Sequence, residues 1–393
     1  MHSSPTTPWA AVAAAAGLLL LSVSCGAPPE PIIGALVPES GAAAVYGKLV
    51  RAGMDLALQE INAAGGVGGQ PLRIIYSDSA SDPEVGKKAA RKLIEEDHVP
   101  LIIGAVSSAV TMAVLEDVSE PAGVPLLSPA ASSPNLTGKS SFFVRIYPSD
   151  SLQGARMAEF ITNDLHLHRI VVFSVIDEYG SGYKRVFIER FRRKKNREVL
   201  KVFNFRPDQT DFQKEIAQAA QLKPEGIFLI GYMNTLAPLV KGIRAAGITA
   251  PLFCSGSLTP QFSSMAGEAA EGVIYARTSF RVIGNKEKVQ PFITAYRSRY
   301  GEEPQDEAAY GYDSIKLAAQ VLEGGARTAR EVHLSLRSPA SRYEGVTGNI
   351  VFGNEGDVVA SPTLYIIHEG APVSYKEYLA QGGKPPVPAG SPR

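Results

Sequence analysis

The sequence is poor in cysteine, in net charge and in long apolar runs. Cys25 and Cys254 are its only cysteines. If Cys25 is consumed by processing, Cys254 has no partner within the chain, so we expect neither a structural disulfide nor a cysteine metal site. The 39 basic and 39 acidic side chains cancel, and no net charge attracts nucleic acid or an anionic membrane. Partners must therefore be recognised by local sites.

Motifs of catalysis and of phosphate or metal binding are lacking too. The glycine-rich stretch 65–69 follows a predicted helix and contains no lysine, which is typical of a helix C-cap and turn. His166 and His168 have no acidic or cysteine partner at metal-site spacing. No Gly-x-Ser-x-Gly elbow is present. We expect no enzyme, no cofactor and no metal.

The longest apolar run lies at the N-terminus. Residues 10–23 are almost entirely apolar and are followed closely by Cys25 and a proline-rich stretch. Such a run is short for a membrane span, and small residues before a cysteine suit a signal peptidase. We expect a signal peptide over 1–24 and a lipidated linker over 25–31, anchored through Cys25 by several acyl chains. A plain cleaved signal and a membrane helix are the alternatives.

From residue 32 onward, short β-type runs alternate with helical patterns. The predicted strands are 32–37, 72–76, 101–104 and 124–127 in a first series, then 169–175, 199–205, 226–230 and 251–254 in a second, with late strands at 348–352 and 363–367. Because parallel strands need crossover helices, the pattern predicts α/β sheets covered by helices on both faces.

Two strand series in succession predict two doubly wound lobes, which separate near the hinge-like segment 147–150. The predicted helices 289–300 and 308–322 indicate a return to the first lobe. We expect lobe 1 over 32–147 plus 278–340, lobe 2 over 148–277 plus 341–372, and a flexible C-terminal tail over 373–393.

Several motifs in order along nearly the whole mature chain resemble those of one family. They are Ile33-Gly34-Ala35-Leu36-Val37-Pro38-Glu39-Ser40-Gly41, the helix from Ala42 to Ile61 followed by Asn62-Ala63-Ala64-Gly65-Gly66, Ile103-Gly104 with Ser107-Ser108, Ser128-Pro129-Ala130-Ala131-Ser132, Tyr179-Gly180-Ser181-Gly182 and Ala269-Ala270-Glu271-Gly272-Val273. The chain resembles the branched-chain amino-acid-binding (Leu/Ile/Val-binding) family of periplasmic solute-binding proteins.

This resemblance implies the periplasmic-binding-protein type I fold, with two lobes joined by three hinge strands. It implies a substrate-binding lipoprotein of an ABC importer, which captures an amino acid of the branched-chain type, or a similar small polar carboxylate or amide, by hinge closure. The implied partners are the importer's permease and its ATPase. We expect a monomer in the periplasm or cell envelope.

A ligand carboxylate is expected where the strand ending at Gly104 gives way to a helix near Ala109. Open α/β folds bind ligands at the carboxyl ends of their strands. The free backbone N–H groups of a helix start and the hydroxyl of Ser108 donate hydrogen bonds to an anion. Ser107 and Thr111 are weaker candidates. The alternative is that these serines only cap the helix.

The resemblance implies further ligand contacts in both lobes. Ala130 would offer its carbonyl to a ligand ammonium and Ser132 would donate to the carboxylate, although an ordinary turn suits this composition equally well. Tyr46 and Tyr179 match positions where the family places rings over the ligand, and Tyr232 is a third candidate. Aromatic side chains bury large areas and keep a polar tip. Core packing is the alternative for each.

One departure from the family bears on the substrate. Where its amino-acid binders present a carboxylate from the second lobe to the ligand ammonium, this chain has Cys254-Ser255-Gly256-Ser257. A buried ammonium without an opposite charge is costly. Either Asp177 or Glu178 substitutes, or the ligand is not an α-amino acid and a small carboxylate, an amide or an aromatic acid takes its place.

A second class of function uses the same fold. A ligand-sensing module would close on its ligand without handing it to an importer, and neighbouring permease genes would discriminate the two. An enzyme on this scaffold is the third class, because fold alone does not fix function.

Overall fold

The two series of apolar runs form two separate sheets. A computed structural model describes residues 1–2 and 30–386 except 339 and 341, so the expected signal peptide and Cys25 lie outside the described residues. The first sheet has the strand order β2-β1-β3-β4-β5 and is parallel throughout. Its strands are β1 (Ile32–Val37), β2 (Arg73–Asp78), β3 (Ile102–Gly104), β4 (Leu126–Ser128) and β5 (Phe143–Arg145).

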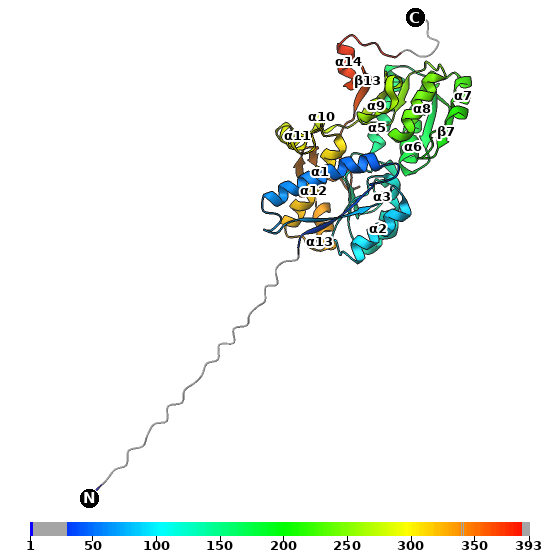
Figure 1. The fold of residues 1–393 in the computed structure, drawn as a ribbon. Helices are drawn as coiled ribbons and strands as arrows, with labels where there is room; N and C mark the ends of the chain where they lie inside the picture. Colours follow the sequence, from blue (N-terminus) through cyan, green and yellow to red (C-terminus); the bar gives the residue numbers. More distant parts are fainter. Residues whose placement is uncertain (3–29, 339, 341, 387–393) are drawn as a thin grey trace.

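Helices of the first lobe come from both ends of the chain. They are α1 (Ala44–Ala63), α2 (Pro83–Glu95), α3 (Ser108–Val114), α4 (Glu120–Ala122), α10 (Phe280–Ile283), α11 (Lys286–Tyr300), α12 (Asp306–Glu323) and α13 (Ala329–Arg337). Figure 1 shows the blue and cyan elements together with the orange α12 and α13 in one body. The expected return of the chain to the first lobe is therefore seen in the structure.

The second lobe is built on a larger sheet of order β14-β13-β10-β9-β8-β6-β7. Its strands are β6 (Arg169–Val175), β7 (Glu198–Phe205), β8 (Gly226–Ile230), β9 (Leu252–Cys254), β10 (Ile274–Arg277), β13 (Thr363–His368) and β14 (Ala371–Ser374), and its helices are α5 (Asp150–Glu159), α6 (Glu178–Arg192), α7 (Gln213–Leu222), α8 (Met233–Ala245), α9 (Gln261–Ala266) and α14 (Tyr375–Ala380). All five residues of β8 are buried, as expected for a strand covered by helices on both faces.

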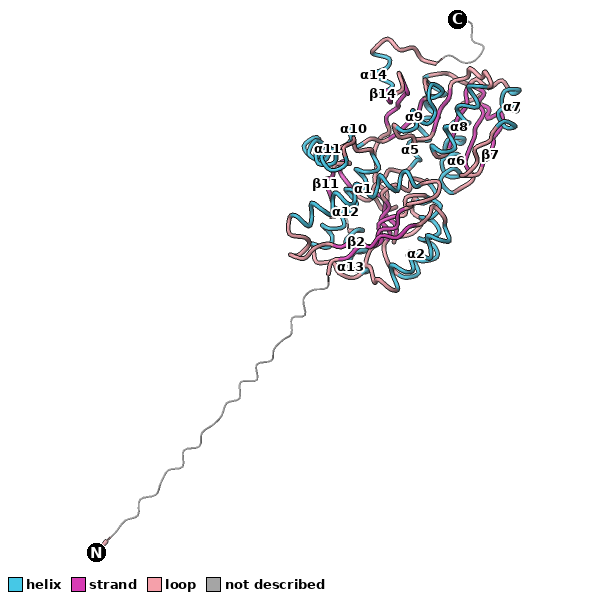
Figure 2. The backbone as a smooth tube through the Cα atoms, viewed as in Figure 1, coloured by secondary structure: helices cyan, strands magenta, loops and turns pink. Residues whose placement is uncertain are grey.

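The chain passes between the lobes three times, after β5, after β10 and before β13. Figure 2 shows the two groups of magenta strands in separate bodies, with the crossing segments between them. Two α/β lobes with three connections are the architecture that the sequence predicts. Among the described residues, no helix is both long enough and apolar enough to cross a membrane.

Helices α1 and α12 pack closely because glycines lie at their contact. A Cβ atom on Gly53 would lie 1.8 Å from the carbonyl oxygen of Ala308, and one on Gly311 would lie 2.2 Å from that of Val50. Neither position tolerates a side chain in this packing. The close contact brings the first turn of α12 next to the first turn of α1, and both turns contribute to the site described below.

Residues 341–372, which we expected in the second lobe, divide between the two. Strands β11 (Tyr343–Gly345) and β12 (Gly348–Ile350) form a separate hairpin. The buried carboxylate of Asp313 in α12 fixes its turn by accepting from the backbone N–H of Val346 at 3.1 Å and of Thr347 at 2.7 Å. The hairpin therefore packs on the first lobe, and the expected boundary needs correction.

The segment after the hairpin also stays on the first lobe. The fully buried guanidinium of Arg145, at the end of β5, donates to both carboxylate oxygens of Asp357, at 2.7 and 2.9 Å. Bidentate pairs of this kind are strong and geometrically specific. After the hairpin, the chain returns to the second sheet only at β13.

The expected flexible tail from residue 373 is wrong for its first part. Strand β14 pairs antiparallel with β13, and α14 follows directly. Tyr375 of α14 packs edge-on against Phe160, with 4.9 Å between ring centroids. Burial of this ring ties the segment to the second lobe. Residues 387–393 lie outside the described part of the chain.

Candidate functional site

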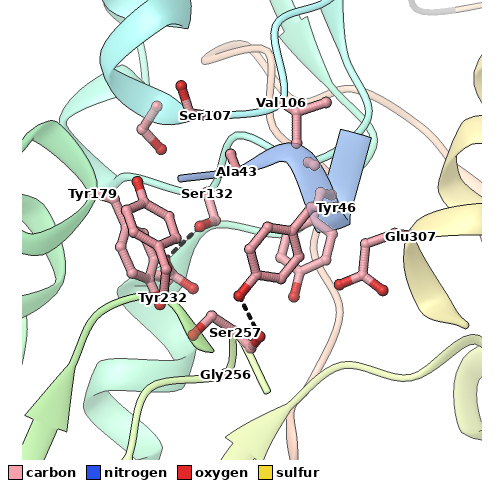
Figure 3. Close-up of a pocket in the computed structure, with 14 residues that line it drawn as sticks. Ala43, Tyr46, Val106, Ser107, Ser132, Tyr179, Tyr232, Gly256, Ser257 and Glu307 are labelled. Atoms are coloured by element: carbon pink, nitrogen blue, oxygen red, sulfur yellow. Dashed lines mark hydrogen bonds between the residues drawn. The ribbon is translucent and has the colours of Figure 1, made fainter. Parts of the chain in front are cut away.

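A pocket lies where the two lobes meet, with about 540 Å³ of empty space that is partly open to solvent. Its walls come from the carboxyl ends of strands in both sheets and from the helices that follow them (Figure 3). The lining residues are Ala43, Tyr46, Val106, Ser107, Ser108, Ala130, Ser132 and Glu307 from the first lobe, Tyr147 and Asp150 from the first crossing, and Tyr179, Tyr232, Gly256 and Ser257 from the second lobe.

Ser107 and Ser108, which follow β3, both line this pocket but make different hydrogen bonds. Ser107 is the N-cap of α3, where its hydroxyl accepts from the backbone N–H of Val110 at 3.4 Å. Ser108 is the first residue of the helix, one position before the expected start. Its hydroxyl accepts from the N–H of Ser133 at 3.1 Å, so the hydroxyl hydrogen stays available to an acceptor in the pocket. The capping alternative therefore holds for Ser107, which also faces the pocket.

Thr111 does not line the pocket. Its fully buried hydroxyl lies within 3.1 Å of the carbonyl oxygen of Ala105 and 2.8 Å of that of Ser107. Its single hydrogen is shared between these two acceptors. Thr111 therefore stabilises the loop before α3 and has no donor to offer a ligand, which corrects its place among the expected contacts.

The loop after β4 brings Ala130 and Ser132 to the pocket as expected. Ser132 is joined twice to Asp150: its hydroxyl donates to the carboxylate at 2.6 Å, and its carbonyl accepts from the Asp150 N–H at 2.9 Å. Its hydrogen is thus already used. Ser132 offers a ligand an acceptor oxygen, whereas the family resemblance implied a donor for the carboxylate.

Three tyrosines form an aromatic wall across the lobes. Tyr179 and Tyr232 of the second lobe stack with 5.5 Å between centroids, and Tyr46 of the first lobe lies 6.2 Å from Tyr232. The Tyr46 hydroxyl donates to the carbonyl of Ser257 at 2.9 Å and accepts from the N–H of Met233 at 3.3 Å. Burial raises the pKa of all three phenols, so they are neutral and act as hydrogen-bonding rings.

Residues 254–257 of the second lobe, where the chain departs from the family pattern, bring no carboxylate to the pocket. Gly256 and Ser257 line the pocket there. A Cβ atom on Gly256 would lie 2.0 Å from the side-chain oxygen of Gln153. The same Cβ atom would lie 2.6 Å from the carbonyl oxygen of Ala276, so Gly256 itself cannot carry an acidic side chain in this packing.

Neither of the two acids named from the sequence lines the pocket. Asp177 caps α6 by accepting from the N–H of Gly180 at 2.7 Å, and it also accepts from the hydroxyl of Tyr232 at 2.7 Å. Glu178 reaches across to the first lobe, where it accepts from Ser133 at 3.1 Å and from Asn135 at 2.6 Å. Asp177 therefore orients a ring, and Glu178 bridges the lobes.

Two acids that the sequence reasoning missed do line the pocket. Asp150, at the start of α5, is 2% exposed, and burial raises the pKa of its carboxyl to about 7 against the opposing effects of Ser132 and Arg145. Glu307, at the start of α12, is 5% exposed and pairs with Arg277 at 2.8 Å. The hinge segment was a signal for Asp150. The sequence held no comparable signal for Glu307, because an acidic residue in the first turn of a helix commonly does no more than interact favourably with the helix dipole.

The arrangement suits a small molecule with charges of both signs. Neither lysine nor arginine is among the residues that line the pocket. Donors for an anion come from the hydroxyl of Ser108 and the backbone beside it. Acceptors for a cation come from Asp150, Ser132 and the carbonyl of Ala130. The described residues show no group of three or more histidine, cysteine, aspartate or glutamate side chains that could hold a metal ion.

Comparisons with known proteins agree with this geometry. An amino acid binding protein of Pseudomonas aeruginosa is 26% identical over 357 residues, which is 89% of this chain and 92% of the relative. The Leu/Ile/Val-binding protein of Escherichia coli is 27% identical over 349 residues, 87% of this chain and 92% of the relative. The branched-chain amino acid transporter substrate-binding protein of Streptococcus pneumoniae, solved with isoleucine, is 27% identical, with a TM-score of 0.77 over 88% of this chain and 99% of that chain.

These similarities confirm the resemblance stated from the sequence, and with it the two-lobed type I fold. The relatives are solute-binding proteins and not enzymes. Residues 32–368 match the family described as periplasmic binding protein, and the chain therefore belongs to that family.

Proposed function

We propose that the protein is the extracytoplasmic substrate-binding component of an ABC importer and that it captures an α-amino acid between its lobes. The observation that carries the proposal is the placement of Asp150 and Ser108 in one pocket, an acceptor for an ammonium and a donor for a carboxylate. The E. coli relative is named a Leu/Ile/Val-binding protein and the S. pneumoniae protein was solved with isoleucine, which supports a ligand of this class.

The carboxylate contact in this proposal lies on the first lobe. The hydroxyl hydrogen of Ser108 would donate to the carboxylate, together with N–H groups of the first turn of α3, which has no carboxylate of its own. Charge-assisted hydrogen bonds from such donors are stronger than neutral ones. Ser107 would contribute indirectly, because it caps the helix turn that holds Ser108 at the pocket.

The ammonium contact replaces the acid that the second lobe lacks. A carboxyl with a pKa of about 7 is half ionised at neutral pH. A ligand ammonium beside Asp150 favours the ionised form. The carbonyl of Ala130 and the hydroxyl oxygen of Ser132 complete the acceptors. The first crossing between the lobes would then hold the charge that other family members take from the second lobe.

Capture by lobe closure is supported by the hydrogen bonds that join the lobes over the pocket. Tyr46 reaches Ser257 and Met233, and Glu178 reaches Ser133 and Asn135. A ligand that binds between the lobes adds contacts to this arrangement and shifts the population toward it. The aromatic wall would close over the bound amino acid.

Delivery to a membrane importer completes the proposal. Acylation at Cys25 would hold the chain at the membrane surface as a monomer, and the closed form would dock on a permease driven by its ATPase. Membership of the periplasmic binding protein family supports the extracytoplasmic location. The sequence bears no net charge, in keeping with a partner recognised by shape and local contacts.

Thermal unfolding of residues 27–393 with a ligand panel tests the proposal. The panel contains amino acids, short carboxylates, amides and aromatic acids. A true ligand at 100 times its dissociation constant adds about 2.7 kcal/mol to the free energy of unfolding. We expect this stabilisation with α-amino acids. Stabilisation by carboxylates or amides without an amino group, and by no amino acid, would contradict the proposed ligand class.

A further inference from the structure

One carboxylate oxygen in the pocket has no hydrogen-bond partner within the described part of the chain. This atom is Oε2 of Glu307, a buried side chain that is 5% exposed and lines the pocket. Buried acceptors are nearly always paired, because an unpaired one forfeits its hydrogen bonds to water. The side chain therefore has an unused acceptor at the wall of a ligand site.

The orientation of Glu307 is fixed by its other oxygen. Oε1 accepts from Nη2 of Arg277 at 2.8 Å. The same guanidinium pairs with Asp306 at 2.6 Å and donates to the carbonyl of Leu258. Burial lowers the pKa of Arg277, but the carboxylates of Glu307 and Asp306 outweigh it and hold the pKa well above the ordinary value. Glu307 cannot turn away from the pocket without breaking this network.

Glu307 lies away from Ser107 and Ser132, which belong to the two loops proposed to hold the carboxyl and amino ends of the ligand (Figure 3). Figure 3 shows it on the far side of Tyr46 from Tyr179 and Tyr232, with its carboxylate turned toward Tyr46. The acceptors for the ammonium, Ser132 and Asp150, come from the loop after β4 and the first crossing. The free oxygen of Glu307 therefore faces the part of the pocket left for the ligand side chain.

We propose that Glu307 determines specificity by accepting a hydrogen bond, through Oε2, from a donor on the side chain of the bound amino acid. This inference rests on the proposed function and deepens it. The site then prefers a side chain that ends in an amide, hydroxyl or ammonium group over an aliphatic one of the same shape. It rejects a side chain that ends in a carboxylate, because two carboxylates would face each other. A site built around a hydrogen bond discriminates more sharply than an apolar pocket does.

Isosteric amino acids test the preference directly. Leucine, asparagine and aspartate have the same arrangement of heavy atoms in the side chain and differ in donor and charge. Norleucine with ornithine extends the comparison to a longer, unbranched side chain. Dissociation constants are measured by calorimetry on residues 27–393. We expect the donor-bearing member of at least one set to bind at least about tenfold more tightly than its aliphatic partner, and aspartate to bind more weakly than asparagine.

The variant Glu307→Met removes the acceptor and keeps the length of the side chain. We expect it to reduce the donor preference to less than about twofold. Asp306→Asn is the matched control, because it weakens the pairing of Arg277 without changing a residue that lines the pocket. The control should keep the preference. Binding of an amino acid by both variants shows that they are folded.

Two outcomes overturn the inference, and they are distinguishable. If aliphatic amino acids bind the unmodified protein as tightly as their donor-bearing partners in every set, or if Glu307→Met keeps the preference, the role of Glu307 is wrong and the amino-acid-binding function stands. If no α-amino acid binds at all, the proposed function fails and this inference fails with it.

Discussion

The two walls of the pocket differ in the kind of group they supply. The first lobe and the first crossing contribute both carboxylates, together with hydroxyls, carbonyls and the rings of Tyr46 and Tyr147. The second lobe contributes two stacked tyrosines, Gly256 and Ser257, and no carboxylate. Polar groups on one wall can hold a ligand before closure, and flat rings on the other can cover it afterwards. The difference teaches that the charged groups of the pocket lie on one side of it only.

The largest expected effect comes from Asp150. Asp150→Asn keeps the shape and removes the charge opposite a ligand ammonium, and loss of a charge-assisted hydrogen bond costs about 1.5–3 kcal/mol. We expect affinity for α-amino acids to fall about tenfold to a hundredfold, as measured by calorimetry. Asp313→Asn, a buried acid outside the pocket, should leave affinity unchanged. Equal losses in both variants would break the assignment of the ammonium to the first crossing.

The pH dependence of stability follows from the same residue. Burial raises the pKa of Asp150 from 3.8 to about 7 and that of Asp313 to about 6. The folded ligand-free protein binds more protons than the unfolded chain between pH 4 and 7, so its free energy of unfolding falls as pH rises, by up to about 1.4 kcal/mol per unit for each group.

Asp150→Asn should remove most of the fall between pH 6 and 7 and leave the smaller part that Asp313 contributes there. Denaturant unfolding at a series of pH values measures this. The ligand-induced stabilisation should instead grow from pH 6 to 8, because the ammonium binds the ionised carboxylate. An unchanged slope in the variant would contradict the assigned pKa of Asp150.

Ser108 should have the next largest effect. Ser108→Ala removes the donor to a ligand carboxylate, and a hydrogen bond to a charged group contributes about 1.5–3 kcal/mol. We expect about tenfold weaker binding of amino acids. Thr111→Val, which removes the hydroxyl that does not line the pocket, should lower stability but keep affinity. A loss of affinity in Thr111→Val comparable to that in Ser108→Ala would show that the fold of the loop, and not the donor, matters.

The bridge between the lobes at Glu178 should have the smallest effect. Glu178→Ala removes acceptors for Ser133 and Asn135 and favours separation of the lobes. We expect affinity to fall about twofold to fivefold, mainly through faster ligand release, because a hydrogen bond within a protein contributes about 0.5–1.5 kcal/mol. Stopped-flow dissociation measures this. Glu189→Ala removes an exposed ion pair with Arg193 within α6 and should leave the release rate unchanged.

Much of the fold could be predicted because its signals are local. The runs 169–175 and 226–230 coincide with β6 and β8 to the residue. A strand buried on both faces must be apolar throughout, and its neighbours in sequence show where it ends. The late strand expected at 348–352 overlaps β12, but its partner β11 and the position of the hairpin on the first lobe were not predicted, since Asp313 fixes the turn from 33 and 34 residues away.

The site shows the same division. The residues expected from strand ends and turns, Ser108, Ala130 and Ser132, line the pocket with the three tyrosines. Thr111 was wrongly expected at the pocket. It lies one helical turn after Ser107 and Ser108, and its hydroxyl faces the loop before α3. Glu307 could not be predicted, because it reaches the pocket only through the contact of α12 with α1.

By itself, the sequence determined the two α/β lobes, the absence of a second-lobe acid at residues 254–257 and the serines and tyrosines that line the pocket. These follow from apolar periodicity and from motifs read in order along the chain. Only the tertiary structure decided which acidic side chains line the pocket in place of an acid at residues 254–257. Charges act through space, and the partners of Asp150 and Glu307 are set by how the lobes and helices pack.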